Sequence, residues 1–83
     1  MTAKEMFEKL GYKILIPFDI DSNYIIVAYD KEMYGDSQTV YFYSSKELRI
    51  VYEDKRGNIY PPIFDLGTLE AINQQVKELG WYE

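Results

Sequence analysis

The sequence contains neither cysteine nor histidine. Without cysteine, the chain can form no disulfide and no thiolate metal site. Without histidine, it lacks the commonest metal ligand and the commonest general base near neutral pH. The five glycines are scattered and form no phosphate-binding loop. Because these absences remove most residue sets that support catalysis, we predict a protein that is not an enzyme and that uses no cofactor or metal.

Long apolar runs are also missing. No segment approaches the roughly 20 apolar residues that span a bilayer, and the first residues lack the apolar stretch of a signal peptide. We therefore expect a cytoplasmic protein without a membrane partner. The formal charge of −5, from nine Lys and Arg against fourteen Asp and Glu, disfavours direct binding to nucleic-acid phosphates.

What the sequence does contain is enough apolar material for one core. Of its 83 residues, 47% are hydrophobic and 17% are aromatic, and nine are tyrosine. A chain of this size forms one domain, so we expect a single domain over residues 1–83. Tyrosine suits half-buried sites, where the ring is in an apolar environment and the hydroxyl is in water.

Both ends of the chain predict a short capped helix. Thr2 to Glu5 form a capping box, and Gly11 ends the first helix with Tyr12 folding back on Phe7. The last segment repeats this design, with Thr68 as the expected N-cap, Gly80 as the stop and Trp81 packing back on the helix. The expected apolar stripes are Ala3, Met6, Phe7 and Leu10 in the first helix, and Leu69, Ile72, Val76 and Leu79 in the second.

Between the helices, apolar residues recur at every second position, which indicates strands joined by short turns. The predicted strands are 14–16, 24–29, 39–43 and 48–52, with a short last strand at 59–60 after the hairpin signal Arg56-Gly57-Asn58. Pro17 favours an edge position or a bulge in the first of them. Because short connections join antiparallel neighbours, we predict an α+β fold: a helix, an antiparallel meander of three to five strands and a second helix.

Two amphipathic helices need an apolar surface, and one face of the small sheet is the available partner. We assign to this face Ile25, Val27, Val40, Phe42, Leu48 and Ile50. The opposite face then carries the candidate interaction surface, which consists of Tyr24, Ile26, Tyr41, Tyr43, Val51 and Tyr60. A set of this size exceeds scattered exposure and predicts a cover, either a second copy of the chain or another protein.

The acidic residues of 19–36 have several interpretations. Asp19 to Asn23 begins like a calcium loop, but an intervening strand would separate its ligands by roughly 20 Å. We place the acidic residues in two loops at opposite ends of one strand, too far apart for a catalytic dyad. Solvated turns are the expected role, with a surface for a basic partner as the alternative. Ser44, Ser45 and Lys46 form a turn without a supporting base.

The two end segments also carry a resemblance. Residues 2–12 (TAKEMFEKLGY) and 69–81 (LEAINQQVKELGW) resemble those of short uncharacterised proteins encoded in phages and prophages of low-GC Gram-positive bacteria. The matching residues are helix caps and packing faces, and the resemblance covers the ends only. It implies a cytoplasmic protein of a phage or prophage region, and it supplies no catalytic or binding residues.

These observations favour a non-enzymatic protein-interaction module of phage or prophage type that self-associates through its tyrosine-bearing face. An alternative hypothesis is an acidic phage-encoded inhibitor, whose carboxylates mimic a nucleic acid and bind a host nucleic-acid-binding enzyme. A third hypothesis is that the tyrosines stack on single-stranded nucleic acid. Such platforms normally lie in a basic groove, whereas simple alternation places only Arg49 on that face.

Overall fold

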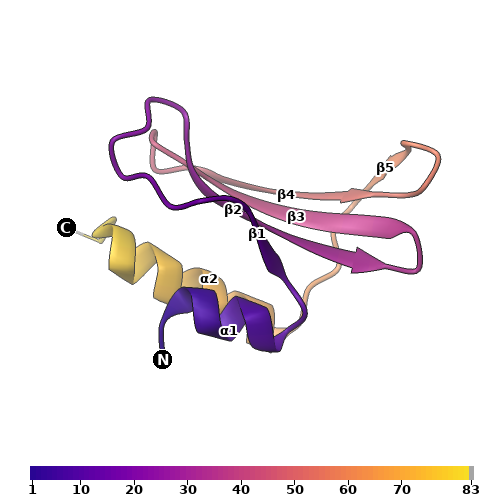
Figure 1. Cartoon of the computed structure of the whole chain (residues 1–83), viewed down its shortest axis with the longest axis horizontal. Coiled ribbons are helices and arrows are strands. Elements are labelled where there is room, and N and C mark those ends of the chain that lie inside the picture. The colour runs from indigo at the N-terminus through magenta and orange to yellow at the C-terminus, as the bar shows by residue number, and fades with distance from the viewer. Residues whose placement is uncertain (83) are drawn as a thin grey trace.

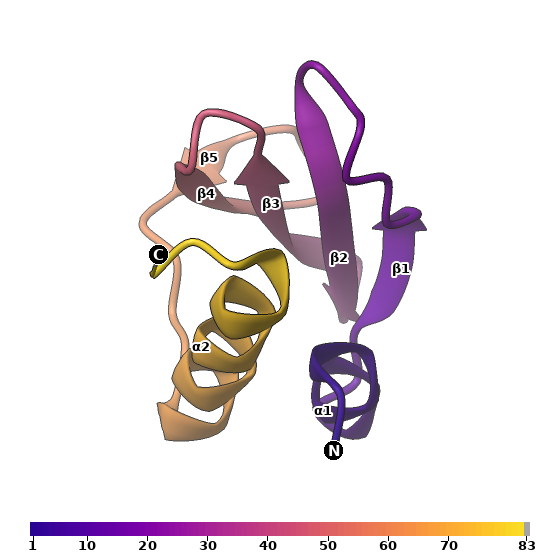
Figure 2. The ribbon, with the colours of Figure 1, turned by 90° about the vertical axis from the view of Figure 1, so that its left-hand side faces the viewer.

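The computed structural model describes residues 1–82 and shows two helices beneath one face of a five-stranded sheet (Figures 1 and 2). The strands form an antiparallel meander whose spatial order equals their order in the chain. The predicted α+β fold is therefore confirmed. The elements are α1 (Ala3–Lys9), β1 (Lys13–Ile16), β2 (Ile25–Met33), β3 (Asp36–Tyr43), β4 (Leu48–Glu53), β5 (Ile59–Tyr60) and α2 (Leu66–Leu79).

The ends of α1 follow the predicted local chemistry. The Thr2 side chain accepts a hydrogen bond from the Glu5 N–H, and the Glu5 carboxylate accepts one from the Thr2 N–H, which completes the capping box. At the other end Gly11 has a φ of +96°, and the Tyr12 N–H donates to the Phe7 carbonyl at 3.0 Å. The Tyr12 ring meets the Phe7 ring edge-on, so the predicted Schellman-type ending is confirmed.

The start of α2 differs from the prediction. Its N-cap is Asp65, whose carboxylate accepts hydrogen bonds from both the N–H and the hydroxyl of Thr68. Thr68 therefore lies in the first turn and is not the cap. Aspartate is an equally good N-cap residue, and its position adds one turn at the start of the helix. Within residues 1–82, no helix is long and apolar enough to cross a membrane.

The side of α2 that faces the core follows the predicted stripe at Ile72, Val76 and Leu79 but departs from it at Leu69. Its buried residues are Thr68, Ala71, Ile72 and Gln75, whereas Leu69 is 43% exposed. The physical reason is the contact with α1 and the sheet, which selects small and polar residues that can approach closely or form hydrogen bonds. The end of α2 follows the prediction: Gly80 is left-handed and the Trp81 N–H donates to the Val76 carbonyl.

β2 and β3 extend further than predicted and form one long hairpin. A two-residue turn, Tyr34-Gly35, joins them, and both residues have positive φ, as the twist of a tight hairpin requires. This turn was not predicted from the sequence because tyrosine is uncommon at positive φ. The Arg56-Gly57-Asn58 turn and the short β5 are present as predicted.

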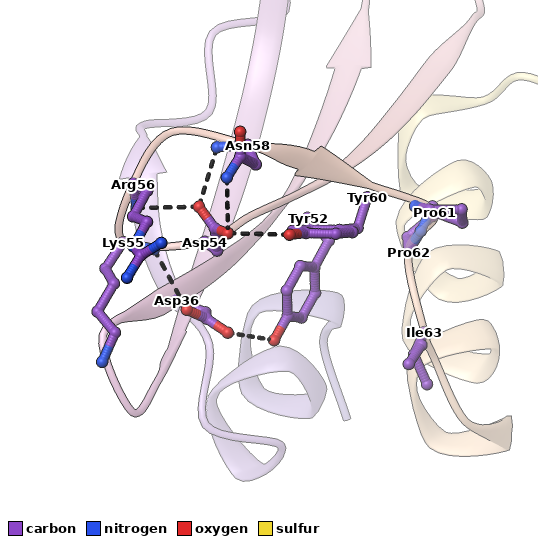
Figure 3. Close-up of a pocket in the computed structure, with 10 residues that line it drawn as sticks. All are labelled: Asp36, Tyr52, Asp54, Lys55, Arg56, Asn58, Tyr60, Pro61, Pro62 and Ile63. Atoms are coloured by element: carbon purple, nitrogen blue, oxygen red, sulfur yellow. Dashed lines mark hydrogen bonds between the residues drawn. The ribbon is translucent and has the colours of Figure 1, made fainter.

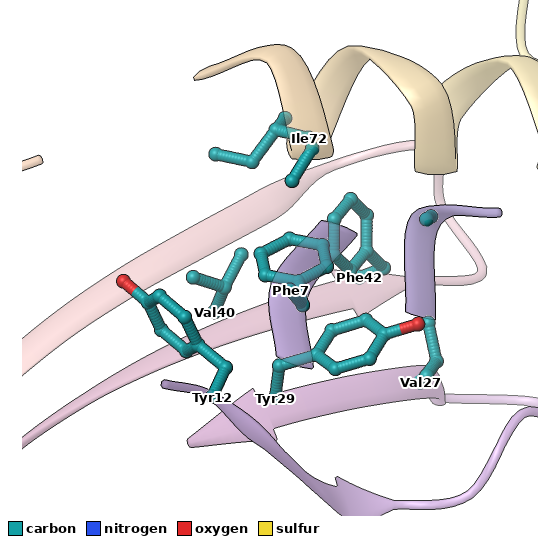
Figure 4. Packing of buried hydrophobic residues seen from close by; sticks show 9 residues of the cluster. Phe7, Tyr12, Val27, Tyr29, Val40, Phe42 and Ile72 are labelled. Carbon is teal, nitrogen blue, oxygen red and sulfur yellow. The ribbon is translucent and has the colours of Figure 1, made fainter. Parts of the chain in front are cut away.

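The core lies between the helices and the sheet, and Phe7 is at its centre (Figure 4). The Phe7 ring stacks on Tyr29 at 4.1 Å between centroids and meets Tyr12 and Phe42 edge-on. These aromatic pairs add to the stabilisation from burial alone. Val27, Val40, Phe42 and Ile50 contact the helices as predicted.

Polar side chains inside the core are paired between elements. The Tyr29 hydroxyl donates to Gln75 Oε1 of α2 at 2.6 Å, and Gln38 Nε2 donates to the Tyr12 hydroxyl at 2.8 Å. Burial raises the pKa of Tyr29 to about 12, and the negative charges of Glu78 and Glu8 act in the same direction. These pairs hold the helices on the sheet in one orientation.

Irregularities in β1 and β2 change which side chains face the helices. The pairing of β1 with β2 shifts between Ile14 and Ile16, which agrees with the predicted edge strand or bulge. A second shift lies between Ile25 and Val27 of β2, so Ile25 pairs with Tyr43 instead of continuing the core alternation. Ile25 was therefore wrongly assigned to the core. Leu48 pairs with Phe42 but remains 41% exposed, so it adds little to the core.

Candidate functional site

The candidate site is the outer face of the sheet, which is the face that carries neither helix (Figure 2). Cross-strand pairing defines its rows, because residues directly opposite each other in a ladder share a face. One row contains Ala28, Tyr41 and Arg49, and the next contains Asp30, Thr39 and Val51. The third row contains Glu32, Ser37 and Glu53.

Three tyrosines gather at one end of this face, and we call them the tyrosine patch: Tyr24, Tyr41 and Tyr43. The ring of Tyr43 lies 5.4 Å from that of Tyr24 and 6.2 Å from that of Tyr41, measured between centroids. Tyr24 is 68% exposed, and the other two are half-buried. Sequence reasoning placed these three together, and the structure brings them into contact.

The other predicted site residues are placed differently. Val51 is half-buried on the outer face, one row from Tyr41. Ile26 is only 3% exposed, so it supports the sheet and offers little area to a partner. Tyr60 pairs with Tyr52, which alternates with the core residue Ile50, and this register puts Tyr60 on the helix side of the sheet. Tyr60 was therefore wrongly assigned to the outer face.

The opposite end of the outer face is acidic. Glu32 and Glu53 flank Ser37 across three strands, and Asp30 follows in the neighbouring row. Asp30 accepts a hydrogen bond from the Thr39 hydroxyl at 2.7 Å. Asp30, Glu32 and Asp36 lie in strands, which corrects their predicted place in a loop. Because β2 separates this end from Asp19 and Asp21, the two acidic groups remain distant, as predicted.

The outer face is therefore divided along its strands. Arg49 lies beside the tyrosine patch, and Glu53 lies about 13 Å away, because it is four positions further along β4. The middle row contains the uncharged Thr39 and Val51 together with Asp30. Within the residues that the structure describes, no group of three or more acidic side chains could hold a metal ion. The chemistry available on this face is aromatic contact, hydrogen bonding and ion pairing.

Sequence reasoning missed a hollow on the helix side of the sheet, next to β5. The hollow has a volume of about 810 Å³ and includes Tyr52, Tyr60 and Pro61 among its lining residues. The hairpin signal at 56–58 and the adjacent prolines indicate a turn and a stop. They could not reveal that the chain crosses back to α2 and leaves a hollow between the crossing and the sheet.

Comparison of the chain with protein-family models, with curated proteins and with solved structures gives no match. The function must therefore be inferred from the geometry of the surfaces themselves.

Proposed function

We propose that this protein is a protein-interaction module without a catalytic role, and that its outer face binds the same face of a second copy. The observation that supports the proposal is the tyrosine patch on a sheet face that neither helix covers. Tyr43 contacts both Tyr24 and Tyr41, and all three still expose ring surface. Tyrosine is enriched in protein interfaces, where its rigid ring covers a large area at little cost in conformational entropy.

The charge division of the same face favours a second copy as the partner. In a two-fold symmetric interface, a contact between two different positions occurs twice, once in each direction. A two-fold axis along the middle row of Thr39 and Val51 places Arg49 of each copy near Glu53 of the other. Thr39 and Val51 of the two copies then meet each other, and each tyrosine patch lies beside the acidic end of its partner. Asp30, in the same row, opposes the contact by repulsion.

The association is expected to be weak. Each copy has a formal charge of −5, which produces repulsion over distance. Only a few side chains of the face are aromatic, and Ile26 is already buried. We therefore expect a dimer at high micromolar concentration, as for small transient interfaces.

Sedimentation velocity tests this proposal directly. The chain of 9.9 kDa should approach twice that mass as its concentration rises through the high micromolar range. Tyr41→Glu should return it to the monomer while circular dichroism retains the helical signal. A strict monomer for the parent chain at several hundred micromolar would refute self-association.

A charge exchange makes the test specific to the proposed symmetry. Arg49→Glu alone should weaken the dimer, because it places like charges opposite each other. Combining it with Glu53→Arg should restore the dimer, since the same two positions meet across the axis. Failure of the double variant to recover, with both chains folded, would reject this arrangement of the two copies.

The alternative function, an acidic inhibitor that mimics a nucleic acid, has less support. Mimicry needs carboxylates spaced along the molecule, whereas the acidic residues of 19–36 gather at opposite ends of β2 with the uncharged residues 25–29 between them. Affinity capture from a host lysate at low and moderate salt would show a salt-sensitive basic partner if the alternative holds. The phage or prophage type and the cytoplasmic location stay predictions that rest on sequence alone.

A further inference from the structure

The hollow next to β5 has walls of a different chemistry from the outer face (Figure 3). One side is formed by the rings of Tyr52 and Tyr60, whose centroids are 6.3 Å apart and whose planes meet at 78°. The facing side is the segment Pro61 to Ile63, which runs from the sheet toward α2. Tyr60 is 48% exposed, so its ring is accessible to a ligand.

Both phenol groups donate to carboxylates. The Tyr52 hydroxyl donates to Asp36 Oδ2 at 2.7 Å, and the Tyr60 hydroxyl donates to Asp54 Oδ2 at 3.1 Å. These hydrogen bonds and the neighbouring negative charges raise the pKa of Tyr52 and of Tyr60. Hydrogen bonds from Asn58 are the largest cause that lowers the pKa of Asp54. At neutral pH the hollow therefore contains neutral aromatic rings beside the ionised carboxylate of Asp54.

Apart from the side chains of Lys55 and Arg56, which also line it, the hollow offers acceptors and almost no free donors. The phenol hydrogens are used by the aspartates, and prolines have no N–H group. The Ile63 N–H donates to Gln38 Oε1, and the backbone N–H groups of 55, 56 and 58 donate to Asp36 or Asp54. What remains is aromatic surface, phenol lone pairs and the unused acceptor capacity of Asp36. A ligand that matches these acceptors and rings must bring hydrogen-bond donors.

We propose that this hollow binds the guanidinium group of an arginine side chain presented by a protein partner. Guanidinium has five N–H donors and no acceptor, so it complements a surface that is rich in acceptors. It also stacks on aromatic rings better than an ammonium group does. The net charge of −5 attracts a basic partner from a distance. This site is independent of the proposed dimer, because it lies on the other side of the sheet.

Lys55 and Arg56 at the rim are the features that oppose a cationic ligand. Across residues 1–82, neither forms a salt bridge and neither lies over a tyrosine ring, so the hollow is not already occupied by a cation of its own chain. Their positive charge nevertheless lowers the affinity for another cation. Removing the charge of Arg56 should therefore strengthen binding, whereas a site for an anion would respond in the opposite way.

The test uses the full chain labelled with ¹⁵N and two small probes of nearly identical shape. N-acetyl-arginine amide should cause saturable shifts of the amide signals of Tyr52, Tyr60 and Ile63. N-acetyl-citrulline amide, which is neutral, should bind about tenfold more weakly or not at all, because a cation–π contact of about 1.4 kcal/mol corresponds to a factor of ten. Equal shifts with both probes would overturn the proposal.

Four variants locate the binding. Tyr60→Ala should lose most of the affinity, and Tyr60→Phe should retain part of it because the ring remains. Arg56→Gln should bind more tightly than the parent, and Tyr24→Ala, on the outer face, should bind like the parent. Unchanged affinity in folded Tyr60→Ala, or weaker binding by Arg56→Gln, would reject the site. Sedimentation of the same variants reports separately on the dimer, so either proposal can fail without the other.

Discussion

The two faces of the sheet use tyrosine in opposite ways. On the covered face, Tyr29 and Tyr12 are buried, and their hydroxyls are paired with Gln75 and Gln38. On the outer face, the rings of the tyrosine patch contact one another and remain partly in water. The residue type is the same, so the difference comes from register and from the helices that cover one face. A tyrosine-rich sequence therefore does not by itself indicate an exposed aromatic surface.

We expect the free energy of unfolding to depend mainly on side chains of the covered face. Phe7→Ala removes the ring at the centre of the core, which is fully buried and contacts the rings of Tyr12, Tyr29 and Phe42. We expect a loss of about 3–5 kcal/mol in the free energy of unfolding, measured by urea denaturation. A loss below about 1 kcal/mol would mean that the core is not organised around this ring.

The buried hydroxyl of Tyr29 gives a prediction with a pH signature. Its pKa is raised from 10.0 to about 12, so ionisation favours the unfolded chain. The contribution is fully present below pH 10 and is lost as the pH rises toward 12, by on the order of 2 kcal/mol. Denaturation of the parent and of Tyr29→Phe at several alkaline pH values should show a shallower decline for the variant. Parallel declines would contradict the assignment.

Asp65 is the N-cap of α2, one of the two helices that cover the inner face of the sheet. Asp65→Ala removes the acceptor of the Thr68 N–H and hydroxyl, and we expect a loss of about 1 kcal/mol in unfolding free energy. Hydrogen bonding to Thr68 lowers the pKa of Asp65, so its stabilisation is present at neutral pH and is lost on acidification through that lowered pKa. Asp65→Asn, which keeps a capping side chain, is the matched control and should lose less. Thermal melts of both variants measure the difference.

The smallest effect is expected on the outer face. Tyr24→Ser should change the unfolding free energy by no more than about 0.5 kcal/mol, because Tyr24 is 68% exposed and serves no core contact. The unfolding free energy should be measured at low micromolar protein concentration, where the monomer dominates. If this substitution destabilised the monomer as much as Asp65→Ala, the contrast between the two faces would fail.

The sequence by itself determined the features that depend on neighbours in the chain. The capping box at Thr2, the glycine stops at Gly11 and Gly80, and the alternation of the strands all follow from groups a few residues apart. Short connections then determine an antiparallel meander, and two amphipathic helices require one sheet face. Tyr41 and Tyr43 of the patch were predictable for the same reason, since they alternate with the core residues Val40 and Phe42 along β3.

Only the tertiary structure decided the features that depend on register and on distant contacts. The irregular pairing near Ile25 turns that side chain out of the core, and the pairing of Tyr60 with Tyr52 places it on the helix side. The pairing of Gln75 with Tyr29 joins residues far apart in the chain. A one-residue shift moves a side chain to the opposite face, and nothing local in the sequence specifies such a shift. Register therefore determines which tyrosines are buried and which remain available to a partner.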